Sequence, residues 1–411
     1  MAKTTRRDIL RAALAMPVAS SLAHFEALAA PARKQVKITS IQAVQLKQRG
    51  TLIRVDTDAG ITGFGECSGS GPFARAAIAG LEGPRLPHLG LIGKDPLAIQ
   101  VHHHNMFYAY AQRGRVTRVL SGIDMALWDL AGKLLNLPVS KLLGGNFRDE
   151  ILLYSHCAGG DFQSQEQWRD RAQNLKSDRR GITAFKVDIH HALGLNMQEF
   201  SPSIGPQDAA KVHRAYTLAR EALGPEIDII VHCHCELDTG SAIRVAEAVE
   251  HIKPLYLEDP LAPNFSPSWM ALRRSTRLPL MTGENIDLVD QALPFLENQA
   301  VDLLQPDIVN SGGITGVMKI ADAAARYRTP IALHNVSGLL LAASSQQVAA
   351  AVFNCPRIES IRNADELPWA KPNPLVIRNG RMKVSTAPGL GVELDQDYMK
   401  SNRADGEPWW G

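Results

Sequence analysis

From about residue 151, short apolar runs alternate with stretches whose hydrophobic residues recur at helical spacing. This alternation predicts strand–helix units around a parallel sheet. Eight such units predict a (β/α)8 barrel over residues 151–370, with an atypical eighth unit. The runs are ILLYS (151–155), AFKVD (184–188), IDIIVH (227–232), PLYLE (254–258), PLMTGE (279–284), VDLLQPD (301–307), PIALHN (330–335) and RIESI (357–361).

Residues 36–150 have a different pattern, in which strand-like runs precede helical ones and predict an α+β unit. Residues 371–411 contain strand-like fragments and several prolines, and we expect them to return to this unit. The predicted elements are an antiparallel meander at 36–46, 51–57 and 61–67, and helices at 74–82, 95–112 and 121–135, the last capped by Ser121 or Gly122.

Residues 1–30 have the features of a signal peptide. Arg6 and Arg7 lie in the segment TTRRDILR, and a weakly apolar stretch with an Ala-x-Ala end follows. This order resembles a twin-arginine export signal, with cleavage after Ala29 or a few residues later. We therefore expect a periplasmic or otherwise exported protein; the alternative interpretation is a frayed amphipathic helix.

The composition excludes several classes of protein. The 44 Lys and Arg residues nearly balance the 42 Asp and Glu residues, which argues against a nucleic-acid-binding surface. No run of 18 uninterrupted apolar residues is present, so we expect no membrane-spanning helix. The five cysteines are an odd number in a chain of 411 residues and do not indicate a disulfide framework.

Polar residues gather at the ends of the predicted barrel strands, where catalytic groups of such barrels lie. His232, Glu258 and Glu284 are 26 residues apart on consecutive strands, which places three candidate metal ligands at equal height. Two carboxylates suit Mg²⁺. The other polar residues at strand ends are Lys186, Asp188, His234, Asp307, His334 and Glu359.

Two of these residues form a candidate acid–base pair. Asp307 and His334 end adjacent strands, and a carboxylate can fix an imidazole tautomer and raise its basicity; the alternative is a structural ion pair. His234 would approach the barrel mouth from the side opposite His334. Two opposed acid–base groups with a metal between them can remove a proton and expel a leaving group.

The remaining histidines and cysteines carry weaker signals. Because side chains alternate along a strand, His232 and His234 are expected to face the barrel mouth, and Cys233 and Cys235 to pack behind it. This alternation also disfavours a structural zinc or redox site built from all four. We interpret His102, His103 and His104 mainly as a solvated patch, whereas His190 and His191 could line the pocket.

The chain resembles the enolase superfamily, in its mandelate racemase and muconate lactonizing subgroup, and within it the D-galactonate dehydratase-like acid-sugar dehydratases. The resemblance covers residues 36–385 and implies a modified (β/α)8 TIM barrel with an N-terminal α+β capping domain. Its motifs are GITGFGE, SGIDMALWDLAGK, AFKVD, LYLEDP, TGEN, QPDIVNSGGIT, ALHN and IES.

The resemblance implies metal-dependent dehydration of an aldonate-type sugar acid to a 2-keto-3-deoxy acid. The reaction that the resemblance implies would proceed by C2 proton abstraction, stabilisation of an enediolate by Mg²⁺ and loss of the C3 hydroxyl. The implied catalytic residues are His334 with Asp307 as base, His234 as acid, Glu359 near the substrate carboxylate, and Lys186. The implied substrate-binding residues are Asp188, His190 and Asn335, and the implied metal ligands are His232, Glu258 and Glu284.

The chain departs from the family pattern at two strand ends. His232 replaces an aspartate ligand, and because imidazole is a poor Mg²⁺ ligand, Mn²⁺, Zn²⁺ or Fe²⁺ become alternatives. Asp188 replaces the second lysine of a Lys-x-Lys pair, which argues against two-base racemisation through that lysine. The short segment KQRGTL also leaves little room for a long lid loop.

Three hypotheses follow. The first is the sugar-acid dehydratase, and the second is a racemase, epimerase or cycloisomerase that acts through the same enediolate. The third is a non-catalytic homologue that binds a sugar acid, motivated by His232. In all three the partner is a small molecule rather than nucleic acid or membrane, and the family suggests a homo-oligomer.

Overall fold

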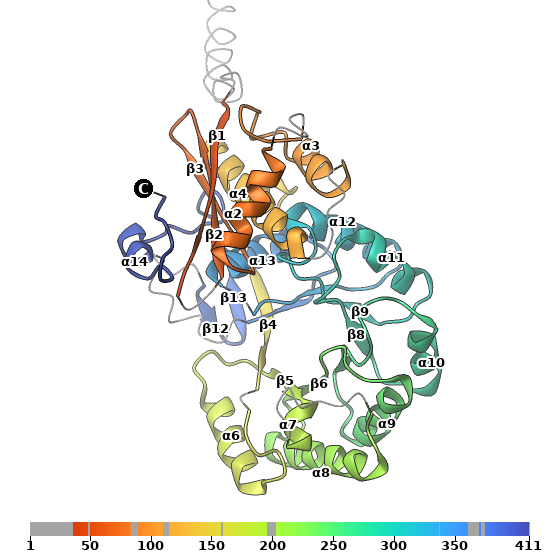
Figure 1. Ribbon diagram of the computed structural model, residues 1–411. Helices are drawn as coiled ribbons and strands as arrows, with labels where there is room; N and C mark the ends of the chain where they lie inside the picture. Colours follow the sequence, from red (N-terminus) through yellow and green to blue (C-terminus); the bar gives the residue numbers. More distant parts are fainter. Residues whose placement is uncertain are drawn as a thin grey trace, which may run out of the picture.

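The computed structural model describes residues 36–47, 50–83, 89–109, 115–157, 159–194, 203–336, 338–360, 370 and 375–410. The proposed signal peptide lies outside these residues. None of the helices in these ranges combines the length and the apolar character needed to cross a bilayer. Two units are visible in Figure 1, a small sheet with helices at the top and a larger barrel below.

The N-terminal unit is an antiparallel sheet of three strands in the order β1-β2-β3, covered by helices. Its elements are β1 (Ile38–Gln45), β2 (Thr51–Thr57), β3 (Thr62–Cys67), α2 (Gly71–Leu81), α3 (Ile99–His104), the π-helix η1 (Asn105–Ala109), α4 (Arg115–Leu135) and α5 (Val139–Leu142). This is the predicted capping domain, and its apolar faces form a core of their own.

The second unit is the predicted modified (β/α)8 barrel. Eight parallel strands run in the order β10-β11-β4-β5-β6-β7-β8-β9, and the isolated bridges Leu304–Ile331 and Asp307–His334 join β9 to β10. The strands are β4 (Glu150–His156), β5 (Ala184–Asp188), β6 (Asp228–His232), β7 (Tyr256–Glu258), β8 (Leu280–Thr282), β9 (Leu303–Leu304), β10 (Ala332–Leu333) and β11 (Arg357–Glu359).

Helices surround the barrel, and the main core lies between them and the strands. They are α6 (Gln165–Ser177), α7 (Ile189–Leu193), α8 (Pro206–Leu223), α9 (Thr239–Val249), the 3₁₀-helix η3 (Glu250–Ile252), α10 (Pro267–Ser275), α11 (Val289–Glu297), α12 (Gly313–Arg326) and α13 (Leu339–Ala351).

The C-terminal segment contacts both units. The hairpin of β12 (Ile377–Arg378) and β13 (Arg381–Lys383) adds to barrel strand β4. The chain then reaches the capping domain, where α14 (Gln396–Ser401) lies beside the small sheet (Figure 1). Arg75 and Glu407 form an ion pair there, with Nη1 2.6 Å from Oε2.

Two buried carboxylates of the capping domain bind the beginnings of barrel helices. Glu66 accepts hydrogen bonds from the amides of Leu340 and Leu341 in α13, at 3.1 and 3.4 Å. Asp124 accepts one from the amide of Thr315 in α12 at 3.0 Å. Because a helix N-terminus carries partial positive charge, these contacts favour docking of the capping domain beside the barrel mouth.

Two expectations for the capping domain are wrong. Helix α4 begins at Arg115, so Ser121 lies within it and its hydroxyl bonds the carbonyl of Thr117 instead of capping. Gly122 is there for close packing, since a Cβ would lie 3.0 Å from the Glu66 carbonyl. His102 and His103 are buried rather than solvated, and His103 Nε2 is 3.1 Å from the carbonyl of Gly312 in the barrel.

Candidate active site

The functional residues face the barrel mouth because side chains alternate along each strand. The barrel interior is filled by a small cluster that includes Tyr154, Ala184, Ile230, Leu303 and Ala332. Residues two positions further along a strand face the same side. The polar ends of the strands therefore continue these inward rows: His156, Lys186 with Asp188, His232, Asp307 and His334.

Strand register then sets their height. Asp188, His232 and Glu258 are direct neighbours on β5, β6 and β7. Glu284 lies two residues beyond the end of β8, at the level of Asp188, His232 and Glu258. The residue before it, Gly283, has a φ of 145°, a backbone conformation that glycine adopts readily and other residues rarely do. A Cβ on Gly283 would also lie 2.6 Å from the amide of Gln305.

Three of these residues suit a divalent cation. His232 Nε2 is 3.5 Å from Glu258 Oε1 and 3.9 Å from Glu284 Oε2. One donor atom from each of the three lies within 4.8 Å of the others. Among the described residues, His232 Nε2 and Glu258 Oε2 are buried atoms without a hydrogen-bond partner. A buried carboxylate and imidazole in this arrangement fit a metal with one nitrogen and two carboxylate ligands.

Asp188 lies directly behind His232. Asp188 Oδ1 is 2.6 Å from His232 Nδ1 and 3.1 Å from His156 Nε2. Burial alone would raise the pKa of Asp188, but these two imidazoles hold it well below its usual range. Burial and Lys186 oppose a charge on His232, yet Glu258 and Asp188 raise its pKa to about 10.

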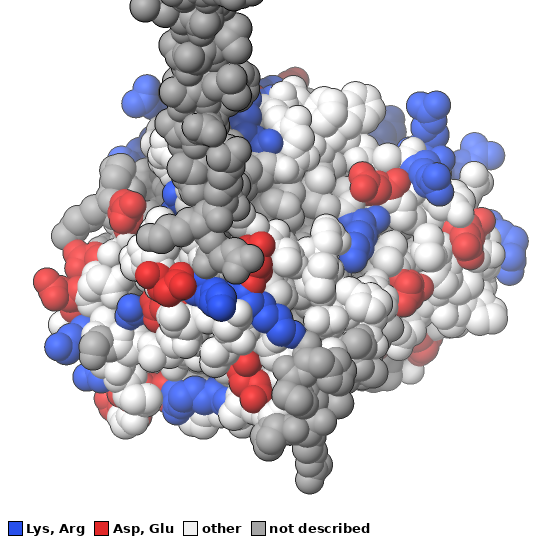
Figure 2. Space-filling model, turned by 90° about the horizontal axis from the view of Figure 1, so that it is seen from above, with Lys and Arg blue, Asp and Glu red and all other residues white. Residues whose placement is uncertain are grey.

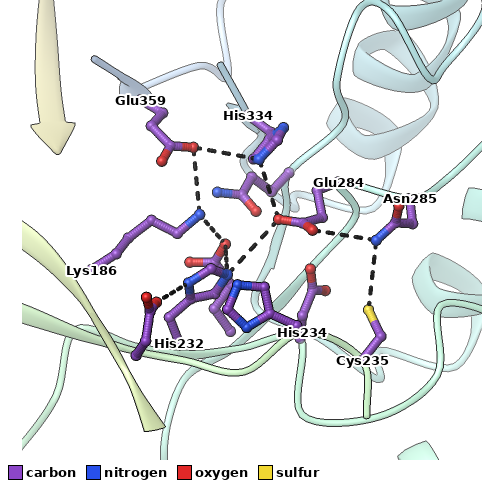
Figure 3. A network of polar contacts seen from close by, with 12 residues as sticks. Lys186, His232, His234, Cys235, Glu284, Asn285, His334 and Glu359 are labelled. Carbon is purple, nitrogen blue, oxygen red and sulfur yellow. Dashed lines mark hydrogen bonds and ion pairs between the residues drawn. The ribbon is translucent and has the colours of Figure 1, made fainter. Parts of the chain in front are cut away.

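A second carboxylate–imidazole pair lies across the mouth. His334 Nδ1 is 2.6 Å from Asp307 Oδ2, and the amide of Val309 donates to Asp307 Oδ1 at 2.7 Å. His334 Nε2 is 3.3 Å from Glu284 Oε2. Burial would lower the pKa of His334, but Glu284 and Asp307 raise it to about 9. Figure 3 shows His334 and His232 on opposite sides of Glu284.

Lys186 forms ion pairs with Glu258, one of the candidate metal ligands, and with Glu359. Its Nζ is 2.6 Å from Glu258 Oε1 and 3.4 Å from Glu359 Oε2. Burial would lower the pKa of this ammonium, but the two carboxylates raise it well above its usual range. Asn335 holds Glu359, because its side-chain amide donates to the Glu359 carbonyl at 3.0 Å.

His234 follows the end of β6 and enters the mouth from the His232 side (Figure 3). Its ring centroid is 4.1 Å from that of His232, and Glu236 accepts a hydrogen bond from its amide. Burial, with the charge of His232, lowers the pKa of His234 to about 3. Cys233 packs in the core as expected. Cys235 does not, because its φ of 64° turns the chain and brings its sulfur 3.9 Å from Asn285 Nδ2.

These side chains open onto one cavity of about 700 Å³. From the barrel it is lined by His156, Lys186, His232, His234, Glu284, His334, Asn335, Val336, Glu359 and Ser360, and from the capping domain by Gly50, Cys67, Ser68 and Gly69. The capping domain thus closes one wall, which the short KQRGTL segment did not suggest.

Two predicted substrate ligands lie elsewhere. Asp188 and His190 are buried behind the wall and are not lining residues of this cavity. His190 Nε2 is 4.0 Å from Asp188 Oδ2, so both belong to the surroundings of His232. His156 is a lining residue that the sequence analysis missed. The signal was present, since it lies two residues beyond the inward-facing Tyr154.

Charge on the outside gives no competing site in the view of Figure 2. Basic and acidic side chains are interspersed on that face, without a continuous area of one sign among the residues drawn in colour.

Comparison with known proteins agrees with this architecture. Residues 26–144 match the mandelate racemase / muconate lactonizing enzyme N-terminal domain, and residues 167–398 match the enolase C-terminal domain-like family. A D-xylonate dehydratase from Haloferax volcanii is 32% identical over 91% of this chain and 90% of its own. A D-gluconate dehydratase from Thermoproteus tenax is 27% identical over 86% of this chain and 70% of its own.

A solved structure extends the likeness to three dimensions. The mandelate racemase/muconate lactonizing enzyme-like protein from Rubrobacter xylanophilus superposes with a TM-score of 0.81 at 30% identity. The match covers 92% of this chain and all of the other.

Proposed function

The chain belongs to the enolase superfamily, in its mandelate racemase and muconate lactonizing group, and we propose that it dehydrates an aldonate-type sugar acid to a 2-keto-3-deoxy acid. Such a reaction makes it a hydro-lyase, in line with the dehydratases among its relatives. The observation that carries the proposal is the pair of imidazoles, His334 and His234, lining one cavity with metal donors between them.

A divalent cation on His232, Glu258 and Glu284 would stabilise the negative charge that develops on the substrate carboxylate when C2 loses its proton. The family leads one to expect Mg²⁺ at such a site, and the imidazole of His232 makes Mn²⁺, Zn²⁺ or Fe²⁺ the alternatives. Lys186 and Glu359 border the same space. The buried ammonium of Lys186 favours an anionic substrate, and Glu359 would accept a hydrogen bond from it.

The protein's own groups move the protons. In its neutral form His334 takes the C2 proton at Nε2, while Asp307 accepts the hydrogen bond from Nδ1 and stabilises the imidazolium that forms. His234 delivers a proton to the C3 hydroxyl, which leaves as water, and the resulting enol tautomerises to the 2-keto acid. Burial keeps the pKa of His234 low, at about 3, so the anionic substrate must raise it to load this acid.

A substrate screen tests the proposal. The purified protein is stripped of metal, reloaded with Mg²⁺, Mn²⁺, Zn²⁺ or Fe²⁺ and offered a panel of aldonates, xylonate and gluconate included, and 2-keto-3-deoxy acid is quantified. We expect one or a few substrates to give product only with metal. Isomerised acid without keto acid would support the racemase, epimerase or cycloisomerase, and tight binding without any turnover would support the non-catalytic homologue.

We also propose export of the chain through the twin-arginine route, on the sequence of residues 1–30 alone. The test is a fusion of this segment to a reporter that is active only after export. Export should be lost when Arg6 and Arg7 are both replaced by Lys. Reporter activity that is the same for the wild-type and the Lys-Lys fusion would contradict the proposal.

A further inference from the structure

His232 and Asp188 occupy neighbouring positions on β6 and β5, and both are nearly inaccessible, with 3% and 4% of their surfaces exposed. The 2.6 Å contact joins His232 Nδ1 to Asp188 Oδ1. A carboxylate can only accept, so Nδ1 carries the hydrogen in this contact. The ring is therefore fixed with Nε2 on the far side.

Nε2 points toward the two glutamates, 3.5 Å from Glu258 Oε1 and 3.9 Å from Glu284 Oε2. No described residue gives this nitrogen a hydrogen-bond partner. Metal-binding histidines commonly donate their other ring N–H to a carboxylate, which fixes the tautomer and makes the ligating nitrogen more basic. Asp188 and His232 have this arrangement.

Asp188 is itself held in place. His156 Nε2 lies 3.1 Å from Asp188 Oδ1, and the other nitrogen of the same ring lies 3.0 Å from the carbonyl of Cys157. The carboxylate, clamped between two imidazoles, has little freedom to turn toward the cavity. This explains why Asp188 is not among the residues that line it.

We propose that Asp188 is a positioning residue that holds His232 as a nitrogen ligand and thereby adapts this centre to an ion of the Mn²⁺, Fe²⁺ and Zn²⁺ class rather than to Mg²⁺. Mg²⁺ prefers oxygen ligands in octahedral geometry, whereas imidazole suits the first-row transition ions. The inference rests on the metal centre of the proposed function, but not on the identity of the substrate.

The test measures metal binding without substrate. Mn²⁺ bound to the full-length protein is examined by pulsed electron paramagnetic resonance, which detects coupling to a ligating ¹⁴N nucleus. We expect this coupling in the wild type and its loss in His232→Asn, which keeps a donor toward Asp188 but has no Nε2. A wild-type spectrum without nitrogen coupling would overturn the proposal, with no variant needed.

Dissociation constants for Mn²⁺, Zn²⁺ and Mg²⁺ give the second readout. Asp188→Asn should weaken Mn²⁺ and Zn²⁺ binding by about 10–100-fold and Mg²⁺ binding much less. Asp307→Asn is the matched control, because it alters the same kind of pair around an imidazole that is no ligand, and it should leave all three constants unchanged. Equal constants for the wild type and Asp188→Asn would contradict a positioning role.

A double variant tests ion selection directly. In His232→Asp/Asp188→Asn the carboxylate introduced on β6 supplies oxygen, and the side-chain amide introduced on β5 can donate to it. The ratio of Mg²⁺ to Zn²⁺ affinity should rise at least about tenfold over the wild type. An unchanged ratio in a folded variant, checked by circular dichroism, would overturn ion selection. Failure of the substrate screen alone would leave these binding results standing.

Discussion

The barrel mouth contains two carboxylate–imidazole pairs of nearly the same geometry. In Asp188–His232 and in Asp307–His334 the imidazole Nδ1 lies 2.6 Å from a carboxylate oxygen, and both pairs join adjacent strands in register. The two pairs differ in the carboxylates that lie near Nε2, the other nitrogen of each imidazole. His232 Nε2 faces Glu258 and Glu284, whereas His334 Nε2 faces Glu284 and Glu359, at 3.3 and 3.9 Å.

In both pairs the carboxylate at Nδ1 fixes the tautomer of the imidazole, but it does not by itself decide the function of the histidine. Glu258 and Glu284 lie close enough to His232 and to each other for the three side chains to hold a cation. Among the described residues, His334 belongs to no such group of metal donors, and its Nε2 is suited to remove a proton. The functional difference therefore comes from the neighbouring strands, and variants that act on one pair should leave the function of the other intact.

The largest effect is expected from His334→Asn. Asn keeps a donor toward Asp307 but lacks a nitrogen at the Nε2 position, so the α-proton has no acceptor. We expect kcat to fall about 10⁴-fold, the upper end of what a positioned base contributes, with Mn²⁺ affinity unchanged. Steady-state kinetics and metal titration on the same preparation check this. A parallel loss of metal would show that the two pairs are not separable.

His234→Asn should lower dehydration by about 10²–10³-fold, because departure of the hydroxyl loses its acid. Removal of the C2 proton does not need His234, so the substrate should still exchange this hydrogen with D₂O, followed by NMR. His334→Asn is the control, since it should abolish both. Loss of exchange in His234→Asn would place this residue in the proton-removal step instead.

Glu66 supports the His334 side alone, since it binds the start of α13, shortly after His334 and Asn335. Burial raises its pKa from 4.5 to about 7, although backbone amides oppose the shift. A raised carboxyl pKa stabilises the fold below about pH 4.5, and this stabilisation is lost as pH rises through 7. The shift corresponds to about 3 kcal/mol.

Urea unfolding of the wild type and Glu66→Gln at pH 5 and pH 8 measures this effect. The wild-type free energy of unfolding should fall relative to that of the variant as pH increases, because Gln cannot ionise. Mn²⁺ affinity at the His232 side should be the same in both proteins. A difference between wild type and variant that is independent of pH would mean that Glu66 stays ionised throughout.

Much of the barrel and of its mouth could be predicted from the sequence, because the buried parallel strands are short apolar runs, and each ends in a polar residue or is followed directly by one. The equal spacing of His232, Glu258 and Glu284 along the chain predicted that these three residues lie together. Alternation alone could not predict the turn at Cys235, which has a positive φ, nor the contact between Asp188 and His232. The sequence predicted Asp188 as a substrate ligand, whereas in the structure it contacts His232 and is not among the residues that line the cavity.

The contacts between the capping domain and the barrel could not be predicted from the sequence. Glu66, Asp124 and His103 each bind backbone groups more than 180 residues away in the barrel. Nothing in their local pattern shows such a partner. His156 is a different case, because counting two residues from the apolar Tyr154 would have found it.

The smallest effect is expected from substitution of His156. This residue contacts Asp188 and so distinguishes the Asp188–His232 pair from the Asp307–His334 pair. Asp307 is held by a backbone amide, that of Val309, whereas Asp188 is held by the side chain of His156. Only the second can be removed by substitution. His156→Asn lacks a nitrogen at the Nε2 position, so the Mn²⁺ affinity should fall about two- to tenfold, the value of one net hydrogen bond. His156→Gln places an amide donor there and should retain affinity. If both variants bind Mn²⁺ like the wild type, the position of Asp188 does not depend on His156, and Asp188 positions His232 without help from that side chain.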